Sequence, residues 1–551
     1  MPTLEWIGKE KVINHHQEVP FRVLDRQYSF DENGQHTEDN GSENMIIHGD
    51  NLEALKALLP RFEGQVKCIY IDPPYNTGNE NWVYNDNVND PKIKKWLGDL
   101  VGKEGDDLTR HDKWLCMMYP RLKLLHKLLS VEGAIFISID DNEIVYLRAI
   151  MDEIFGSSNF IAQITLLCNP KGRSQDKYFA TCHEYLLVYT KSTVPTGWFS
   201  VQKDNEKINK EYKLSDENGK YRLLELRNTH REFGKMNRPN LWYPIYANPE
   251  DGSVSLESDE IHTQEIYPVW PDGFEGCWTW GADLSKRDVH LLCAQKKSGI
   301  WKVYRKSYAV TESGAAMQKL FTIWNSPLFF TEKGQVAFGH IFPGANKNDF
   351  PQPKSVDYVM EAIRTITHDG DIVLDSFAGS GTTGQAVLNL NADGENRHFI
   401  LVEMMDYADS ITAERVRRVI RGYGEGKNAV EGTGGSFSYY DLGEPLLIGE
   451  NLNEAVASEK IREYIWFMET KTPYSPAAGD NPYYLGQHND TGYYFYYEPQ
   501  RITVLDYDFL STITEKTVGT VIYADRCSIN DDKLSQMGIV FKKIPRDISR
   551  L

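Results

Sequence analysis

The sequence predicts an α/β protein built around a doubly wound, mostly parallel sheet. Short apolar runs with the length of buried strands alternate with stretches whose apolar residues have helical spacing. A glycine-rich turn between one such strand and a helix is typical of nucleotide-binding folds. The expected strands are 45–48, 68–71, 134–139, 160–167, 183–189, 371–374 and 398–402, and the expected helices are 51–59, 114–129, 144–155, 356–366 and 385–390.

The composition indicates a large globular protein with more than one folding unit. The chain has 551 residues, a hydrophobic fraction of 41% and a formal net charge of −19. This acidity disfavours a generally basic nucleic-acid binder but leaves room for a local basic groove. No apolar run is long enough to span a membrane, and residues 1–21 lack the apolar segment of a signal peptide. The seven cysteines are scattered without a C-x-x-C pair, so we expect no disulfide framework or zinc site, and a reducing cytoplasm fits.

The stretch Asp72-Pro73-Pro74-Tyr75 follows the strand expected at 68–71. Proline cannot continue a strand, so the chain must form a loop at the strand's carboxyl end, where open α/β sheets bind ligands. Asp72 and a carbonyl of Pro73 or Pro74 can accept the two hydrogen bonds of an exocyclic amine, and Tyr75 can stack on the base that carries it. The alternative is a Pro-Pro turn capped by Asp72.

A nucleotide-binding turn is predicted after the strand at 371–374. It carries Asp375, Phe377, Gly379 and Gly381, and a helix follows. The glycines permit close backbone approach, and the helix N-terminus offers free N–H groups. Glu403 ends the next strand, 22 residues after Gly381, near the ~20-residue spacing of an acid that binds ribose hydroxyls. No Gly-Lys-Ser/Thr follows, so the turn is not a P-loop. Another mononucleotide fold is the alternative.

Both motifs resemble those of DNA methyltransferases that methylate amino groups with S-adenosylmethionine. The Asp-Pro-Pro-Tyr stretch continues with Asn76-Thr77-Gly78, and residues 375–381 match Asp-x-Phe-x-Gly-x-Gly. The catalytic motif precedes the cofactor motif, which is the permuted order of the beta group. Residues 1–440 also resemble the modification subunit of type III restriction systems, through Leu4-Glu5-Trp6, the Arg-Pro-Asn stretch at 238–240 and the Pro-Lys-Ser stretch at 353–355.

The resemblance implies a circularly permuted Rossmann-like methyltransferase that flips a base and methylates adenine N6. Methylation of cytosine N4 remains open, as do a non-catalytic DNA-reading subunit and, less favoured, an RNA substrate. The implied partners are double-stranded DNA, a second copy of the chain and a separate ATP-dependent helicase-nuclease; a methyltransferase acting alone is equally open.

The resemblance also assigns residues. The cofactor's methionine part is expected at Phe377 and the turn that includes Gly379, Gly381, Thr382 and Thr383, with Asp375 supporting the loop and Glu403 holding the ribose. Asp50 and Asn51 cap the helix at 51–59, lie near the adenine of the cofactor, or do both. Asp140 and Asp141 look like a metal pair, but capping of the next helix is favoured, so no metal is expected.

The expected domains follow from these motifs. An N-terminal arm covers 1–40, the catalytic half of the core 41–193, a target-recognition insert 194–350, the cofactor half 351–430, and an α+β docking or dimer domain 431–551. A long polar loop near the substrate is expected up to about residue 110. The insert interleaves aromatic and basic residues, and its candidate DNA contacts are Arg227, Arg231, Arg238, Lys302 and Arg305. A solvated basic face is the alternative for most of these residues.

Overall fold

A computed structural model describes residues 3–77, 105–203, 205–311, 314–344, 350, 352–472, 474–476 and 481–546, without the side chains of 105–109 and 393. The loop expected near the substrate falls largely on 78–104, outside the described residues. The chain forms two compact units, one from Met1–Trp198 with Phe321–Leu551 and one from Phe199–Leu320. No helix in the described part of the chain is both long and apolar enough to cross a membrane.

The larger unit contains an 11-stranded sheet with the order β19-β6-β7-β5-β4-β20-β21-β3-β24-β1-β2. The strands from β5 through β24 in that order are parallel to their neighbours, and β7, β6, β1 and β2 add antiparallel pairs. This mixed, mainly parallel sheet confirms the predicted fold class. The strands are β1 (Arg22–Asp31), β2 (Gly34–His36), β3 (Met45–His48), β4 (Val66–Ile71), β5 (Leu129–Ile139), β6 (Phe160–Leu167), β7 (His183–Thr190), β19 (Ile323–Trp324), β20 (Ile372–Asp375), β21 (His398–Glu403) and β24 (Ser436–Pro445).

Two distant parts of the chain interleave at the centre of this sheet. β4, from the first part, lies parallel to β20, from the second, and Cys68 and Ile69 pair with Val373 and Leu374. β20 in turn pairs with β21, and β21 with β3. The carboxyl ends of β4, β20 and β21 therefore meet at one edge of the sheet, which is where the two predicted motifs begin.

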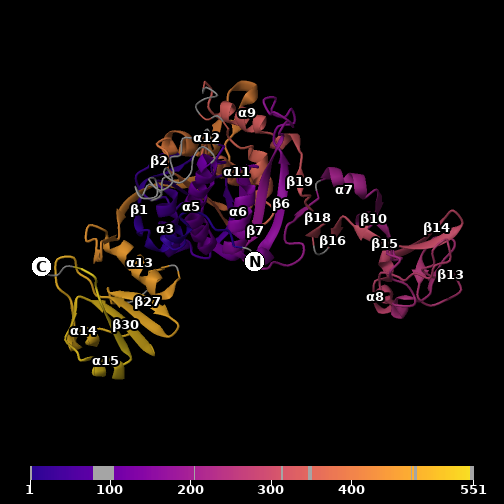
Figure 1. The fold of residues 1–551 in the computed structure, drawn as a ribbon. Helices are drawn as coiled ribbons and strands as arrows, with labels where there is room; N and C mark the ends of the chain where they lie inside the picture. The colour runs from indigo at the N-terminus through magenta and orange to yellow at the C-terminus, as the bar shows by residue number, and fades with distance from the viewer. Residues whose placement is uncertain are drawn as a thin grey trace. The chain divides into compact units, whose positions relative to one another are not determined.

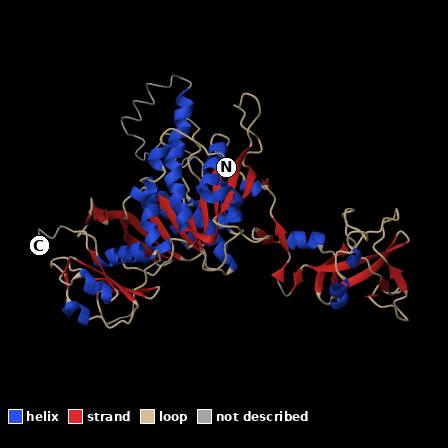
Figure 2. Ribbon diagram, turned by 60° about the horizontal axis from the view of Figure 1, so that its bottom comes forward, coloured by secondary structure: helices blue, strands red, loops and turns tan. Residues whose placement is uncertain are grey.

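Helices cover both faces of the sheet, as Figure 2 shows. Alternate residues of a strand point to opposite faces. Ile135 and Ile137 of β5 belong to a core formed with helices α3, α5 and α6, whereas Ser138 hydrogen-bonds to Tyr358 of α10 on the other face. Helix α10 packs on α11, and α11 on α12. The helices are α3 (Asn51–Phe62), α5 (Gly105–Leu128), α6 (Ile144–Met151), α10 (Val356–Ile363), α11 (Thr382–Leu390) and α12 (Glu414–Arg421).

The N-terminal segment differs from the predicted arm with little core of its own. Residues 22–31 form β1, which pairs along its length with β24 and buries Tyr28 and Phe30. The neighbouring strand β24 runs to Pro445, beyond the boundary expected at 430. β1 also pairs with the short neighbouring strand β2, but its long partner β24 lies about 400 residues further along the chain, so local sequence patterns gave no sign of that pairing.

The Phe199–Leu320 unit is mainly β structure around its own small core. Its largest sheet has the order β14-β15-β10-β9, and a second has the order β12-β11-β13. Leu226, Ile245, Trp278 and Val303 are among the buried residues. The elements are β8 (Ser200–Gln202), α7 (Asn205–Glu211), β9 (Leu214–Asp216), β10 (Gly219–Glu225), β11 (Ile245–Ala247), β12 (Val254–Ser255), β13 (Gln264–Ile266), α8 (Ala282–Arg287), β14 (Leu292–Lys297), β15 (Ile300–Tyr308), β16 (Val310–Thr311), β17 (Gly314–Ala315) and β18 (Met317–Lys319).

The C-terminal part has its own four-stranded sheet, β27-β28-β30-β32, in which β30 and β32 are parallel and helix α15 connects them. The elements, coloured from orange to yellow in Figure 1, are α13 (Ser458–Thr470), β27 (Tyr484–His488), β28 (Thr491–Phe495), α14 (Tyr507–Ser511), β30 (Gly519–Ala524), α15 (Asp531–Gln536) and β32 (Ile539–Lys543).

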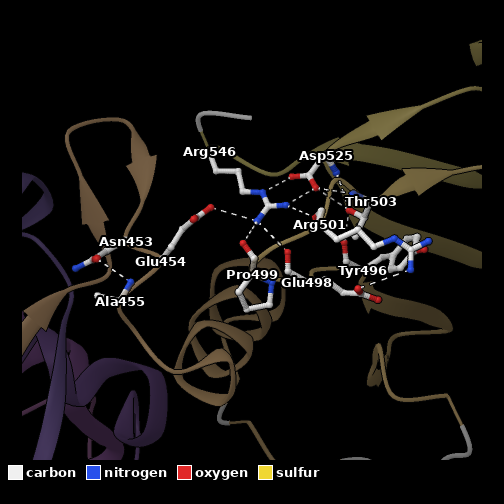
Figure 3. Close-up of polar contacts among 10 residues, drawn as sticks. All are labelled: Asn453, Glu454, Ala455, Tyr496, Glu498, Pro499, Arg501, Thr503, Asp525 and Arg546. Carbon is white, nitrogen blue, oxygen red and sulfur yellow. Dashed lines mark hydrogen bonds and ion pairs between the residues drawn. The ribbon is translucent and has the colours of Figure 1, made fainter. Parts of the chain in front are cut away.

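A buried ion pair joins the end of this domain to its interior (Figure 3). Arg546 donates from Nε and Nη2 to the two carboxylate oxygens of Asp525, at 2.7 and 2.8 Å, and the side chains are 1% and 0% exposed. Arg546 also donates to Glu454 and to the carbonyl of Glu498. Such a bidentate pair fixes the orientation of both groups.

Candidate active site

A cavity of about 390 Å³ lies at the sheet edge where β4, β20 and β21 end. It contains residues of both predicted motifs, although they are about 300 positions apart in the chain. Its lining comprises Tyr70, Asp72, Pro73, Pro74, Tyr75, Phe350, Gln352, Lys354, Asp375, Phe377, Ala378, Gly379, Ser380, Thr382, Thr383, Glu403, Met405 and Tyr407. Drug-sized ligands occupy cavities of roughly 300–1,000 Å³, so a nucleoside-containing ligand fits by volume.

The Asp72 loop presents an unsatisfied acceptor at the cavity. Oδ1 of Asp72 is buried and accepts no hydrogen bond from the described residues, although the Lys354 ammonium lies 3.4 Å away as an ion pair. The carbonyl of Pro74 already accepts a hydrogen bond from the indole N–H of Trp114, at 2.7 Å. Of the two carbonyls that the sequence left open, that of Pro73 is therefore the better candidate to accept from a ligand.

Tyr75 is held by two charged residues that sequence reasoning did not assign. Its hydroxyl donates to Oε2 of Glu184 at 3.0 Å and accepts from Nζ of Lys354 at 2.5 Å. Lys354 also donates to both carboxylate oxygens of Glu184, at 2.9 Å each. Lys354 lies in the Pro-Lys-Ser stretch that contributed to the family resemblance, but no local pattern marks its role, because its partner is 170 positions away on β7.

The glycine-rich turn depends on backbone conformations that suit glycine. Gly379 and Gly381 have φ values of +52° and +80°, and a Cβ on Gly381 would lie 2.8 Å from the carbonyl oxygen of Thr412. Asp375 spans the turn by accepting from the amide of Phe377 at 3.0 Å and the hydroxyl of Thr383 at 2.5 Å. Burial raises the pKa of Asp375 to about 7 despite these donors. The Asp375 carboxylate is thus engaged by donors of the turn itself, and the backbone of the turn borders the cavity.

Glu403 and the buried Arg415 form hydrogen bonds that hold the same turn in place. The Glu403 carboxylate accepts from the amides of Gly379, at 2.7 Å, and Met405, at 3.0 Å. Burial raises its pKa, and these amide donors oppose the shift. Arg415 donates to the hydroxyls of Ser380 and Thr382 at 2.7 and 2.8 Å. Glu403 lines the cavity with lone pairs left over, so it can still accept from a ligand hydroxyl.

Asp50, Asn51 and Gly381 are not among the residues that line the cavity. Asp50 caps α3 by accepting from the amides of Leu52 and Glu53, at 2.9 and 3.2 Å, as the capping alternative predicted. The Asn51 amide donates to the carbonyl of Ser376 at 3.0 Å, so it braces the glycine-rich turn instead of facing the cavity. Asp140 accepts from the amide of Asn142 in the turn before α6.

The five candidate DNA contacts all lie in the Phe199–Leu320 unit, and three of them are engaged with acidic residues. Arg227 and Lys302 both pair with Glu225, at 2.7 and 3.3 Å, and Arg231 pairs with Asp272 at 2.6 Å. Arg227 and Arg231 also lie over the ring of Trp270. Arg238 and Arg305 lie near the rings of Phe233 and Trp280. Nearby carboxylates reduce the positive potential that the sequence alone suggested.

The chain is similar to known proteins over the region that contains both motifs. Residues 66–414 match a family model described as DNA methylase, whose name specifies the N6 and N4 classes. The type III restriction-modification enzyme EcoPI Mod subunit of Escherichia phage P1 is 33% identical over 422 residues, 73% of this chain and 63% of that subunit. The match therefore covers under two thirds of that subunit.

Two further proteins differ in how closely they match. The type II methyltransferase M.KpnI of Klebsiella pneumoniae is 36% identical over 360 residues, 65% of this chain and 80% of its own. Among solved structures, the PvuII DNA methyltransferase (cytosine-N4-specific) has a TM-score of 0.33 at 12% identity, covering 68% of this chain and 86% of its own.

Proposed function

Because the chain belongs to the N6/N4 DNA methylase family, we propose that it is a DNA methyltransferase that transfers a methyl group from S-adenosylmethionine to adenine N6. One observation carries the proposal: the Asp72 loop and the glycine-rich turn line the same cavity at the carboxyl ends of adjacent parallel strands. Neither motif alone specifies this reaction, but a loop suited to an exocyclic amine beside a turn suited to a nucleotide supports it.

The residues present suit the cofactor. Glycine at 379 leaves space that a Cβ would fill against Phe350, at 3.1 Å. Phe377 and the turn residues Thr382 and Thr383 line the cavity and would hold the methionine part, and Glu403 would accept from the ribose hydroxyls. When bound, S-adenosylmethionine supplies a methyl group already activated by its sulfonium.

The Asp72 loop would bind the base. After the target nucleotide leaves the duplex, Tyr75 stacks on its base. Asp72 Oδ1 and the Pro73 carbonyl each accept a hydrogen bond from one of the two N–H groups of the amine. Unstacking costs a few kcal/mol, which these contacts offset. With both hydrogens engaged, the nitrogen lone pair is oriented, and most of the rate enhancement comes from this placement.

The partners that we propose follow from the family resemblance and from the names of the related proteins. We propose double-stranded DNA as substrate and the Phe199–Leu320 unit as the part that contacts it, with a homodimer and a separate ATP-dependent helicase-nuclease as the restriction partner. Arg227, Arg231 and Lys302 are paired with acidic residues, whereas Arg238 and Arg305 form no ion pair with a described residue, so these two are the strongest of the five candidate contacts.

The test is methylation of native genomic DNA with S-adenosylmethionine, followed by mass spectrometry of the nucleosides. We expect N6-methyladenine. Detection of N4-methylcytosine would mean that the target base is cytosine and that the methyl-transfer chemistry is as proposed. Binding of the cofactor without any methylated base would contradict the proposal. An Asp72→Ala variant should bind S-adenosylmethionine and lose methyl transfer, because the cofactor's proposed contacts do not include Asp72.

A further inference from the structure

A lysine and a glutamate from separate parts of the chain join the two ends of the Asp-Pro-Pro-Tyr motif. Lys354 Nζ lies 3.4 Å from Asp72 Oδ1, 2.5 Å from the Tyr75 hydroxyl and 2.9 Å from each carboxylate oxygen of Glu184. The side chains are largely shielded, with exposed fractions of 17% for Lys354, 10% for Glu184 and 27% for Asp72. The ammonium also lies 4.7 Å from the centroid of the Tyr75 ring.

We propose that Lys354 and Glu184 are positioning residues that keep Asp72 a charged acceptor and hold the Tyr75 ring in place for the target base. This inference rests on the proposed methyl transfer and adds two residues to it. Lys354 lines the cavity, whereas Glu184 acts through Lys354 and Tyr75.

The charge balance gives Lys354 its role. Two carboxylates that share a shielded site cannot both remain ionised without a cation, because like charges and burial both favour the protonated form. Burial raises the pKa of Asp72, the Lys354 ammonium lowers it, and Glu184 raises it again. Without Lys354, Asp72 would hold a proton at neutral pH more often and would lose part of its capacity to accept from an amine.

Lys354 supplies a positive charge that persists at neutral pH, because its ammonium group stays protonated there. Burial alone would lower its pKa, but the charges of Asp72 and Glu184 outweigh burial and hold the pKa above the ordinary lysine value. The other titratable groups around the cluster are the phenols of Tyr70, Tyr75 and Tyr358, the thiol of Cys168 and the carboxyl of Asp375. Burial raises the pKa of each phenol and of the thiol, so these groups stay neutral at working pH.

Tyr75 is oriented by the same pair. Its hydroxyl is both donor and acceptor within the cluster, so rotating the ring away from the cavity breaks two charge-assisted hydrogen bonds. A ring fixed before the base arrives loses less conformational freedom when it stacks. The pair therefore acts on both functions of the motif, hydrogen bonding at Asp72 and stacking at Tyr75.

The first test is the pH profile of the single-turnover methylation rate. In Lys354→Met the acid limb should move to higher pH by about one unit, which corresponds to a rate about tenfold lower on that limb. In Glu184→Gln the acid limb should move to lower pH, because a like charge is removed. Lys354→Arg keeps the charge and should restore most of the wild-type profile.

Lys56 provides a matched control. It is buried on α3 and donates to the carbonyls of His16 and Gln17, at 2.9 and 3.2 Å, away from the cavity. Lys56→Met should lower stability and leave the pH profile unchanged. Unshifted acid limbs in both Lys354→Met and Glu184→Gln, or the same shift in Lys56→Met, would overturn the proposal.

A second measurement does not depend on methylation. Burial raises the pKa of Asp72, and the Lys354 ammonium opposes that shift. In Lys354→Met this opposition is lost, so the Asp72 pKa should lie further above its unfolded value, and stability should fall as pH rises. The Tm deficit relative to wild type should grow from pH 5 to pH 7.5, whereas that of Lys56→Met should stay constant in this range. A growing deficit in a protein that methylates nothing would uphold the charge role and reject the proposed function; a constant deficit would reject the charge role itself.

Discussion

Replacing Gly381 by alanine tests whether the glycine-rich turn must keep its observed backbone to bind S-adenosylmethionine. Gly381 has a φ of +80°, and its Cβ would lie 2.8 Å from the Thr412 carbonyl oxygen. A left-handed conformation costs a non-glycine residue roughly 1–2 kcal/mol. The Thr412 hydroxyl donates to the carbonyl of Gly379 at 2.5 Å, so movement at Thr412 also shifts the residue that faces the cavity.

Substitution of Gly370 is the control that separates the cost of backbone strain from the cost of a steric clash at the Cβ. Its φ is +77°, and no atom lies within 4 Å of its Cβ position, so Gly370→Ala carries the backbone cost alone. We expect a loss of about 1 kcal/mol of unfolding free energy in Gly370→Ala, with unchanged cofactor affinity. Gly381→Ala should lose at least as much stability and bind S-adenosylmethionine about tenfold more weakly, or about 1.4 kcal/mol.

Urea unfolding and isothermal titration calorimetry with S-adenosylmethionine measure the two effects. If Gly381→Ala binds the cofactor as tightly as Gly370→Ala does, the turn tolerates displacement and the assignment of the cofactor site to it is wrong. Weaker binding by both variants to the same degree would instead show that general destabilisation, and not the contact with Thr412, controls affinity.

Two further predictions concern buried charges. The pKa of Asp375 is about 7 in the folded state against an ordinary value of 3.8, so this carboxyl group lowers the stability of the protein as pH rises from about 4 to 7. The Tm of Asp375→Asn relative to that of wild type should therefore increase across that range. A Tm difference that stays constant with pH would contradict the raised pKa. Removing one partner of a buried ion pair costs about 3–5 kcal/mol, so Arg546→Met, which leaves Asp525 unpaired, should be strongly destabilised in urea, with faster hydrogen exchange in β28 and β30. Arg501→Met, at an ion pair of 3.9 Å whose arginine side chain is 70% exposed, should cost about 1 kcal/mol or less; equal losses in the two variants would refute the role of burial.

The central elements were predictable because their signals are local. β3 and β6 have the expected bounds, β20 is shifted by one residue at each end, and β21 extends one residue further than expected. Apolar runs, helical spacing and glycine positions depend on neighbours within a few residues, and they suffice to define the two motifs and the parallel sheet. The pairing of β1 with β24 was not predictable, because it joins segments about 400 residues apart.

The sequence by itself predicted the residues that we propose carry the chemistry: Asp72 and Tyr75 on one loop, and Asp375, Phe377 and Glu403 around one turn. Only the tertiary structure decided how those groups are supported. In the folded chain the Pro74 carbonyl accepts a hydrogen bond from Trp114, and the Asn51 amide donates one to the Ser376 carbonyl. Lys354 and Glu184 both form hydrogen bonds with the Tyr75 hydroxyl. The physical reason is that motif residues are marked by local backbone requirements, whereas a buried charge depends on whichever distant side chain lies within hydrogen-bonding distance after folding.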